Sequence, residues 1–186
     1  PPAPELTTQN NPYRGLQSYT EEDADLLFGR NELIKRLASQ VSAQPLTVVL
    51  GASGTGKSSL VNAGLVPRLR TAGKTLPPTN GASAPSPVGQ PTTGMMADQP
   101  GWHILPTMRP GDTPVHLLNE LVLRDLGNVG NIDPSGSAEE RIDAWLTANP
   151  NEHLLLVVDQ FEELITLCRD EHERLRFLTL LASLVT

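Results

Sequence analysis

The pattern of apolar and polar positions predicts strands that alternate with helices. Residues 46–50 form an apolar, β-branched run, and residues 153–158 form an uninterrupted apolar run. A run without alternation is typical of a strand that helices cover on both faces of a sheet. Residues 102–108 resemble a further strand, although Pro106 cannot donate a ladder hydrogen bond and indicates an edge position or a strand end. Strands interspersed with helices predict an α/β core with a parallel sheet.

Helical periodicity accounts for most of the remaining apolar residues. Thr20 to Asp23 resembles a capping box that opens a short helix, and Asn31 is expected to cap a second helix. The buried face of that second helix is expected to comprise Leu33, Ile34, Leu37, Ala38 and Val41. Other helices should begin after a glycine-rich run at Ser58, at Thr113 with Pro114, and at Ser137. The last helix is expected to face the core with Leu175, Leu178, Leu181 and Leu184.

Two segments are too rich in proline and small polar residues to pack. Residues 1–12 are expected to be a linker, and residues 71–101 a disordered insertion, in a chain that contains 17 prolines. The remainder, from residue 13 to residue 186, is long enough for one α/β domain. The chain begins at Pro1 and not at methionine, which suggests that something upstream is missing.

A glycine-rich run after the first expected strand carries the strongest chemical signal. It fits the phosphate-binding pattern G-x-x-x-x-G-K-[ST] at every fixed position, with Gly51, Ala52, Ser53, Gly54, Thr55, Gly56, Lys57 and Ser58. Glycines let backbone N–H groups converge on a polyphosphate, and the following helix, with Ser58 and Ser59, presents its positive end. Lys57 is expected to reach the outer phosphates, and the Ser58 hydroxyl to bind Mg²⁺. The strand, turn and helix context predicts a nucleoside triphosphate site.

The second half of the expected site follows residues 153–158. Asp159 stands at the carboxyl end of that run, where α/β sheets bind ligands, and is expected to hold Mg²⁺ as a Walker B residue. Glu162 and Glu163 come just after it, where one carboxylate could orient or deprotonate a water that attacks the terminal phosphate. Glu163 is favoured for this role, and Glu162 for a supporting one. The alternative is that both are first-turn acids that the helix dipole favours.

Charge and composition exclude some classes of function. The formal charge of -7 argues against a broad nucleic-acid surface. No long apolar run or leader is visible, so we expect no membrane partner and a cytoplasmic location. Cys168 is the single cysteine, which rules out a disulfide within the chain. Arg109, beside Pro110 and Gly111, is expected to be structural and not an arginine finger.

With these motifs placed, the chain resembles the STAND class of signal-transduction ATPases, particularly the bacterial branch fused to WD-type repeats. The similar segments are residues 11–16, 27–32, 51–70, 108–114 and 154–168, in the family's order. The resemblance implies a three-layer α/β/α P-loop fold of the ASCE type. It also implies that Gly29 and Arg30 lie beside the nucleotide base, although Asn31 stands where the family usually has Glu. ATP or ADP is implied as the nucleotide, since no guanine-reading N-K-x-D element is present.

The resemblance further implies a Mg²⁺-dependent switch, in which nucleotide state controls packing against a C-terminal repeat domain, an upstream effector or other copies. A sensor strand normally follows in this class, and this chain stops at Thr186, so we expect a C-terminally incomplete core with reduced stability or activity. Two alternatives stay open. One is a scaffold that binds nucleotide without hydrolysis, and the other, which the acidic balance disfavours, is a nucleic-acid-linked initiator ATPase.

Overall fold

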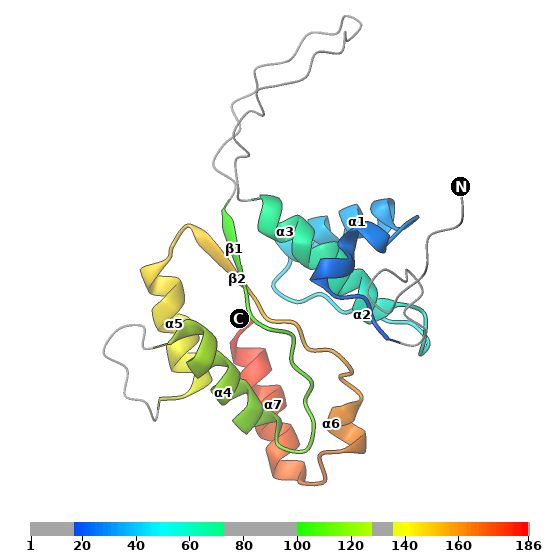
Figure 1. Ribbon diagram of the computed structural model, residues 1–186. Coiled ribbons are helices and arrows are strands. Elements are labelled where there is room, and N and C mark those ends of the chain that lie inside the picture. Colours follow the sequence, from blue (N-terminus) through cyan, green and yellow to red (C-terminus); the bar gives the residue numbers. More distant parts are fainter. Residues whose placement is uncertain (1–16, 73–99, 128–135, 186) are drawn as a thin grey trace, which may run out of the picture.

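The computed structural model describes residues 17–72, 100–127 and 136–185, and is built of helices around a small parallel sheet (Figure 1). The first range holds the 3₁₀ helix η1 (Glu21–Leu26), α1 (Asn31–Ala43), α2 (Lys57–Ser59), the π-helical segment η2 (Leu60–Leu65) and α3 (Val66–Ala72). The second holds β1 (Gly101–Ile104) and α4 (Pro114–Leu126). The third holds α5 (Ala138–Ala148), β2 (Glu152–Leu155), α6 (Glu163–Thr166) and α7 (Glu171–Ser183).

β1 and β2 pair in parallel, with Gly101 opposite Glu152 and Ile104 opposite Leu155. The ladder stops before Pro106, which has no N–H to donate, and resumes as a single bridge between Met108 and Val158. The strand thus ends near Pro106, as one of the two expectations had it, but it is shorter than the expected residues 102–108 because β1 already ends at Ile104. The bridge matters for the site, because it fixes the residues that follow both strands at the same edge of the sheet.

Each face of this sheet carries its own hydrophobic core. On one face, Trp102, Ile104 and Leu155 pack with residues of α1, η2 and α3. On the other, Leu105 and Leu154 pack with residues of α4, α5 and α7. Figure 1 shows the corresponding arrangement, with α1 to α3 on one side of the two strands and α4, α5 and α7 on the other. The observed class is thus a mixture of helices and strands with a small parallel sheet, as expected for α/β.

The strand expected at residues 46–50 is absent, and that prediction was wrong. Within the described ranges, no segment forms a ladder with these residues. Leu46, Val48 and Leu50 are 61%, 67% and 88% exposed, whereas Val49 packs on the core formed by α1, η2 and α3. An apolar, β-branched sequence favours extended backbone, but a strand also needs a neighbouring strand to accept and donate its hydrogen bonds.

Helix ends and faces differ from expectation in three places. Arg30, and not Asn31, is the N-cap of α1, since Asn31 already has helical geometry. Leu33 is 42% exposed, while Ile34 and Leu37 are buried as expected. On α7 the buried face is centred on Phe177, and the expected core residues Leu175 and Leu178 are 55% and 42% exposed. The expected α7 stripe was right for Leu181 and Leu184, which pack against the core, and wrong for Leu175 and Leu178. The helix has apolar residues on more than one face, so periodicity alone did not select the buried one.

Two of the expected segments fall largely outside the described residues. The linker at residues 1–12 does so entirely, and so do residues 73–99 of the expected insertion. The two ends of that insertion were misplaced, since Thr71 belongs to α3 and Gly101 begins β1. In the ranges that the structure does describe, each helix is too short or too polar to cross a bilayer.

Candidate functional site

The glycine-rich run forms a tight turn that leads directly into a helix. Gly54 and Gly56 have φ angles of 76° and 83°, a left-handed conformation that glycine adopts without the cost that a Cβ atom adds. Thr55 closes the turn, because its hydroxyl donates to the carbonyl oxygen of Ala52 at 2.8 Å. Helical backbone then continues without a break from Lys57 to Ala72 through α2, η2 and α3. A turn of this kind can gather N–H groups at the start of the helix.

Lys57 folds back over the turn. Its Nζ donates to the carbonyl oxygens of Gly51 and Ala52, at 2.9 and 3.1 Å. These are exposed hydrogen bonds between a flexible ammonium and neutral oxygens, so the ammonium can exchange them for bonds to an anionic phosphate at little cost.

The contact between Ser58 and Asp159 joins the two halves of the expected site. The Ser58 hydroxyl donates to Asp159 Oδ1 at 2.8 Å, across a separation of 101 residues in the chain. Asp159 is held there by its own backbone, because its N–H donates to the Met108 carbonyl oxygen at 2.8 Å, next to the Met108–Val158 bridge. A second contact, from the Thr107 hydroxyl to Asn62 Oδ1 at 2.9 Å, ties the same edge of the sheet to the helical stretch after the turn.

The chemistry of this pair fits a magnesium ion. A hydroxyl and a carboxylate oxygen are hard ligands, and Mg²⁺ in nucleotide sites is usually held by one or two such protein oxygens together with phosphate oxygens and water. Across the described ranges, no group of three or more His, Cys, Asp or Glu side chains could hold a metal ion alone. Ser58 and Asp159 would therefore hold Mg²⁺ jointly with a phosphate ligand.

The residue after Asp159 turns the chain sharply. Gln160 has a φ of 53°, a left-handed conformation that costs a residue other than glycine about 1–2 kcal/mol. Its carboxamide finds partners on both sides when its nitrogen faces Glu163 and its oxygen faces Arg109. The nitrogen then donates to Glu163 Oε1 at 2.9 Å, and the oxygen accepts from Arg109 Nη2 at 3.0 Å. Arg109 Nη2 also lies 3.9 Å from Asp159 Oδ2.

The two glutamates after Gln160 have different surroundings. Glu162 is exposed and precedes α6, where its carbonyl oxygen accepts the N–H groups of Ile165 and Thr166. Glu163 is partly buried, and its carboxylate faces the Gln160 carboxamide, whose other end contacts Arg109. The two glutamates therefore differ in exposure and in side-chain contacts.

The whole described arrangement falls inside one family match. The model of the family described as nSTAND1, Novel STAND NTPase 1, matches residues 12–186. The chain belongs to the nSTAND1 family. No match was found among solved structures. Membership agrees with the expected STAND resemblance and indicates an NTPase-type domain that takes a nucleotide.

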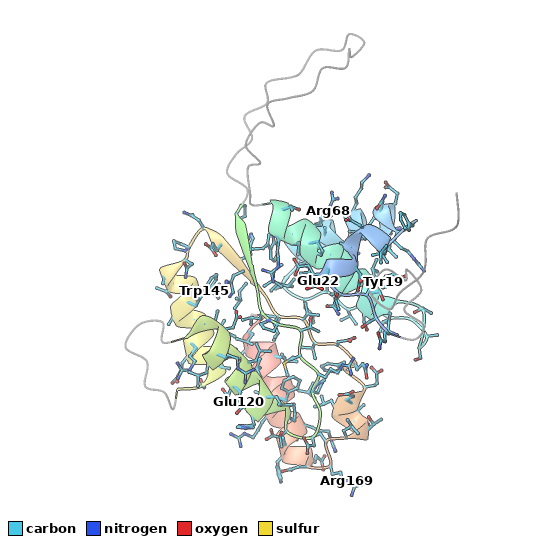
Figure 2. All side chains as sticks on the ribbon, in the orientation of Figure 1. Tyr19, Glu22, Arg68, Glu120, Trp145 and Arg169 are labelled. Atoms are coloured by element: carbon cyan, nitrogen blue, oxygen red, sulfur yellow. The ribbon has the colours of Figure 1, made fainter. Side chains whose placement is uncertain are left out.

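In this nSTAND1 chain, Ser59 and Tyr19 meet beside the glycine-rich turn. The Tyr19 N–H donates to the Ser59 hydroxyl oxygen at 3.0 Å, and Figure 2 labels Tyr19 just before η1, near that turn. Tyr19 therefore lies beside the start of the helical stretch, a contact that no sequence motif indicated. Ser53 is exposed in the turn itself.

Gly29 and Arg30 lie at the start of α1, which packs on the helical stretch that follows the glycine-rich turn. Gly29 has a φ of 73° and Arg30 caps α1. Among the described residues, no hydrogen bond joins either of them to residues 51–59. α1 nevertheless packs closely on η2, since a Cβ atom added at Gly64 would lie 2.8 Å from Ile34 Cδ1. Nearby Glu32 pairs with Lys35 at 2.7 Å, and this hydrogen bond lowers the pKa of the Glu32 carboxyl below its ordinary value.

Arg109 and Gln160 are the site residues that the sequence reasoning missed. Arg109 was expected to have a structural role, and Gln160 was given none. One signal could have found Arg109, because it follows the strand that pairs with β2, and the carboxyl ends of parallel neighbours meet at one edge. The left-handed turn at Gln160 had no signal, since glutamine rarely adopts it.

Proposed function

We propose that this nSTAND1 chain binds ATP with Mg²⁺ between the glycine-rich turn and Asp159, and hydrolyses it slowly as a regulatory switch. The observation that carries the proposal is the 2.8 Å contact between the Ser58 hydroxyl and Asp159 Oδ1. Two residues from distant parts of the chain meet with hard oxygen donors beside a turn built for phosphate. Family membership supports the nucleotide, and the absence of a guanine-reading element favours ATP or ADP.

Each residue has a distinct role in this proposal. The backbone amides of residues 51–56 and the Lys57 ammonium bind the phosphates, and Ser59 lies at the start of the same helical stretch. Ser58 and Asp159 hold Mg²⁺, which when bound neutralises charge on the phosphate oxygens. Glu163 orients or deprotonates the attacking water, with Glu162 in a supporting position. Gly29 and Arg30 are proposed to border the base.

We also propose that the described elements belong to a three-layer α/β/α P-loop fold. Support comes from the two separate cores on opposite faces of β1 and β2.

The regulatory part of the proposal concerns other domains and other copies of the chain. Nucleotide state would control packing against a C-terminal repeat domain, an upstream effector domain or other copies of the chain, in the cytoplasm. Membership of the STAND family supports this regulatory role. The physical basis would be a conformational change that contacts to the γ-phosphate favour. A scaffold that binds nucleotide without hydrolysis is the alternative outcome of the kinetic test described in the Discussion.

Calorimetric titration of ATP with Mg²⁺ tests the nucleotide site. Lys57→Ala is expected to weaken binding by about 10-fold to 100-fold, because a hydrogen bond to a charged group contributes about 1.5–3 kcal/mol. Lys35→Ala is the matched control, since Lys35 is an exposed lysine that pairs with Glu32 on the same helix. Its affinity for ATP should equal that of the unaltered chain. Equal weakening by the two substitutions, or none by either, would remove the phosphate-loop assignment.

A further inference from the structure

Gln160 combines an unfavourable backbone conformation with two side-chain contacts. It is the single residue other than glycine with a positive φ among those the structure describes. Such conformations persist where surrounding contacts hold them, and they cluster at functional sites. Here the turn lies between Asp159 and Glu163, the two carboxylates to which the proposed function gives different roles. The contacts that hold the turn therefore also set how Asp159 and Glu163 are placed relative to each other.

Those contacts form a chain from Arg109 to Glu163. The Arg109 guanidinium donates to the Gln160 side-chain oxygen at 3.0 Å, and the Gln160 side-chain nitrogen donates to Glu163 Oε1 at 2.9 Å. The backbone closes the same turn, since the Glu163 N–H donates to the Gln160 carbonyl oxygen at 2.8 Å. Gln160 thus fixes Glu163 twice, once through its amide side chain and once through its main chain.

Arg109 is in turn fixed beside the sheet edge. It directly follows Met108, whose carbonyl oxygen accepts the Asp159 N–H. Its Nη2 lies 3.9 Å from Asp159 Oδ2, so the guanidinium faces the carboxylate that is proposed to hold Mg²⁺. Arg109 is 54% exposed and the Asp159 carboxylate 15% exposed. One arginine therefore contacts both Asp159 and the side chain of the residue that makes the left-handed turn.

We propose that Arg109 is a positioning residue, which acts through the Gln160 carboxamide to orient the Glu163 carboxylate toward the attacking water. This inference rests on the proposed ATP hydrolysis. It assigns no direct contact between Arg109 and the nucleotide. Loss of Arg109 or of the Gln160 amide should free Glu163 to adopt other rotamers, which lowers the rate of the chemical step and leaves ATP binding unchanged.

The first test is a kinetic double-mutant cycle on the chain with Mg²⁺ and ATP. Arg109→Gln and Gln160→Ala are each expected to lower kcat by about tenfold with KM within about twofold. In a Glu163→Gln background, either substitution should change kcat by less than about twofold, because the group it positions is already gone. A merely structural role would not produce this loss of effect. Additive losses in the double variants, or a rise in KM with kcat unchanged, would overturn the proposal.

The second test does not depend on turnover. Unfolding in urea measures the coupling between Arg109→Gln and Glu163→Gln, expected to be about twofold to tenfold in the unfolding equilibrium constant. This coupling should vanish when Gln160 is replaced by alanine. Arg36→Gln, at an exposed arginine on α1, is the control and should show no coupling with Glu163→Gln.

The two tests separate the two claims. If the unaltered chain releases no phosphate and the coupling through Gln160 is present, the proposed hydrolysis fails while the bridge that positions Glu163 stands. If Arg109 and Glu163 are uncoupled in unfolding, the positioning role is overturned whatever the turnover.

Discussion

At the scale of single residues, Ser58 and Asp159 show what sequence spacing can predict. Each belongs to a pattern with a fixed order, and their side chains meet at 2.8 Å. Arg109 and Gln160 lie in the same cluster but could not be predicted as a pair, because their contact depends on a left-handed turn and on the direction of one carboxamide. Motif spacing encodes neither feature.

Glu163 and Glu162 can be separated by substitution. Glu163→Gln is expected to lower ATP turnover by about 10²-fold to 10⁴-fold, the usual contribution of a general base, while ATP affinity stays within a few-fold. Glu162→Gln, at an exposed position, should change turnover by less than about threefold. Phosphate release measures both. If the chain turns over ATP and Glu163→Gln leaves the rate unchanged, Glu163 does not take part in the chemistry. If the unaltered chain binds ATP and releases no phosphate, the scaffold alternative holds.

At the scale of elements, helix starts were easier to predict than strands. α5 begins after Ser137, whose hydroxyl accepts the Glu140 N–H at 3.2 Å, and α4 begins with Thr113 as its N-cap and Pro114 in its first turn, both as expected. Capping is local, so a few neighbouring residues decide it. Residues 46–50 failed as a strand because pairing is not local: their sequence fits a strand, and the described residues supply no partner.

The orientation of α7 is a testable correction. Phe177 is fully buried in the core with α4 and α5, whereas Leu175 is 55% exposed. Phe177→Ala is expected to lower the free energy of unfolding by about 3–5 kcal/mol, since it leaves a cavity. Leu175→Ala should lower it by less than about 1 kcal/mol. Urea unfolding followed by circular dichroism distinguishes them. A larger loss at Leu175 would restore the face that periodicity alone predicted.

At the scale of the whole molecule, the described ranges divide into two helical groups that the small sheet joins. His103 on β1 ties the sheet to the group of α4, α5 and α7. Its ring packs at a tilt of 44° against Trp145 of α5, which Figure 2 labels, with centroids 5.0 Å apart, and its Nε2 lies 2.7 Å from Asp125 Oδ2 of α4. The α/β class and the STAND family could be predicted from the order of motifs. The sheet's small extent could not, because it depends on which strands find partners.

The site forms where the two helical groups meet at one sheet edge. Ser58 comes from the group of α1 to α3, and Asp159 from the chain after β2. Because the two residues come from different parts of the fold, a cation bound by both oxygens would depend on how the two helical groups are arranged.

The most direct test of the central claim is the effect of Mg²⁺ on ATP affinity in the unaltered chain and in Asp159→Asn, measured by calorimetry with and without the ion. The account predicts that Mg²⁺ tightens ATP binding in the unaltered chain and that Asp159→Asn removes most of this gain, about tenfold or more, because one hard oxygen ligand loses its charge. A gain from Mg²⁺ that is equal in both proteins would contradict the claim that Asp159 and Ser58 hold the ion together.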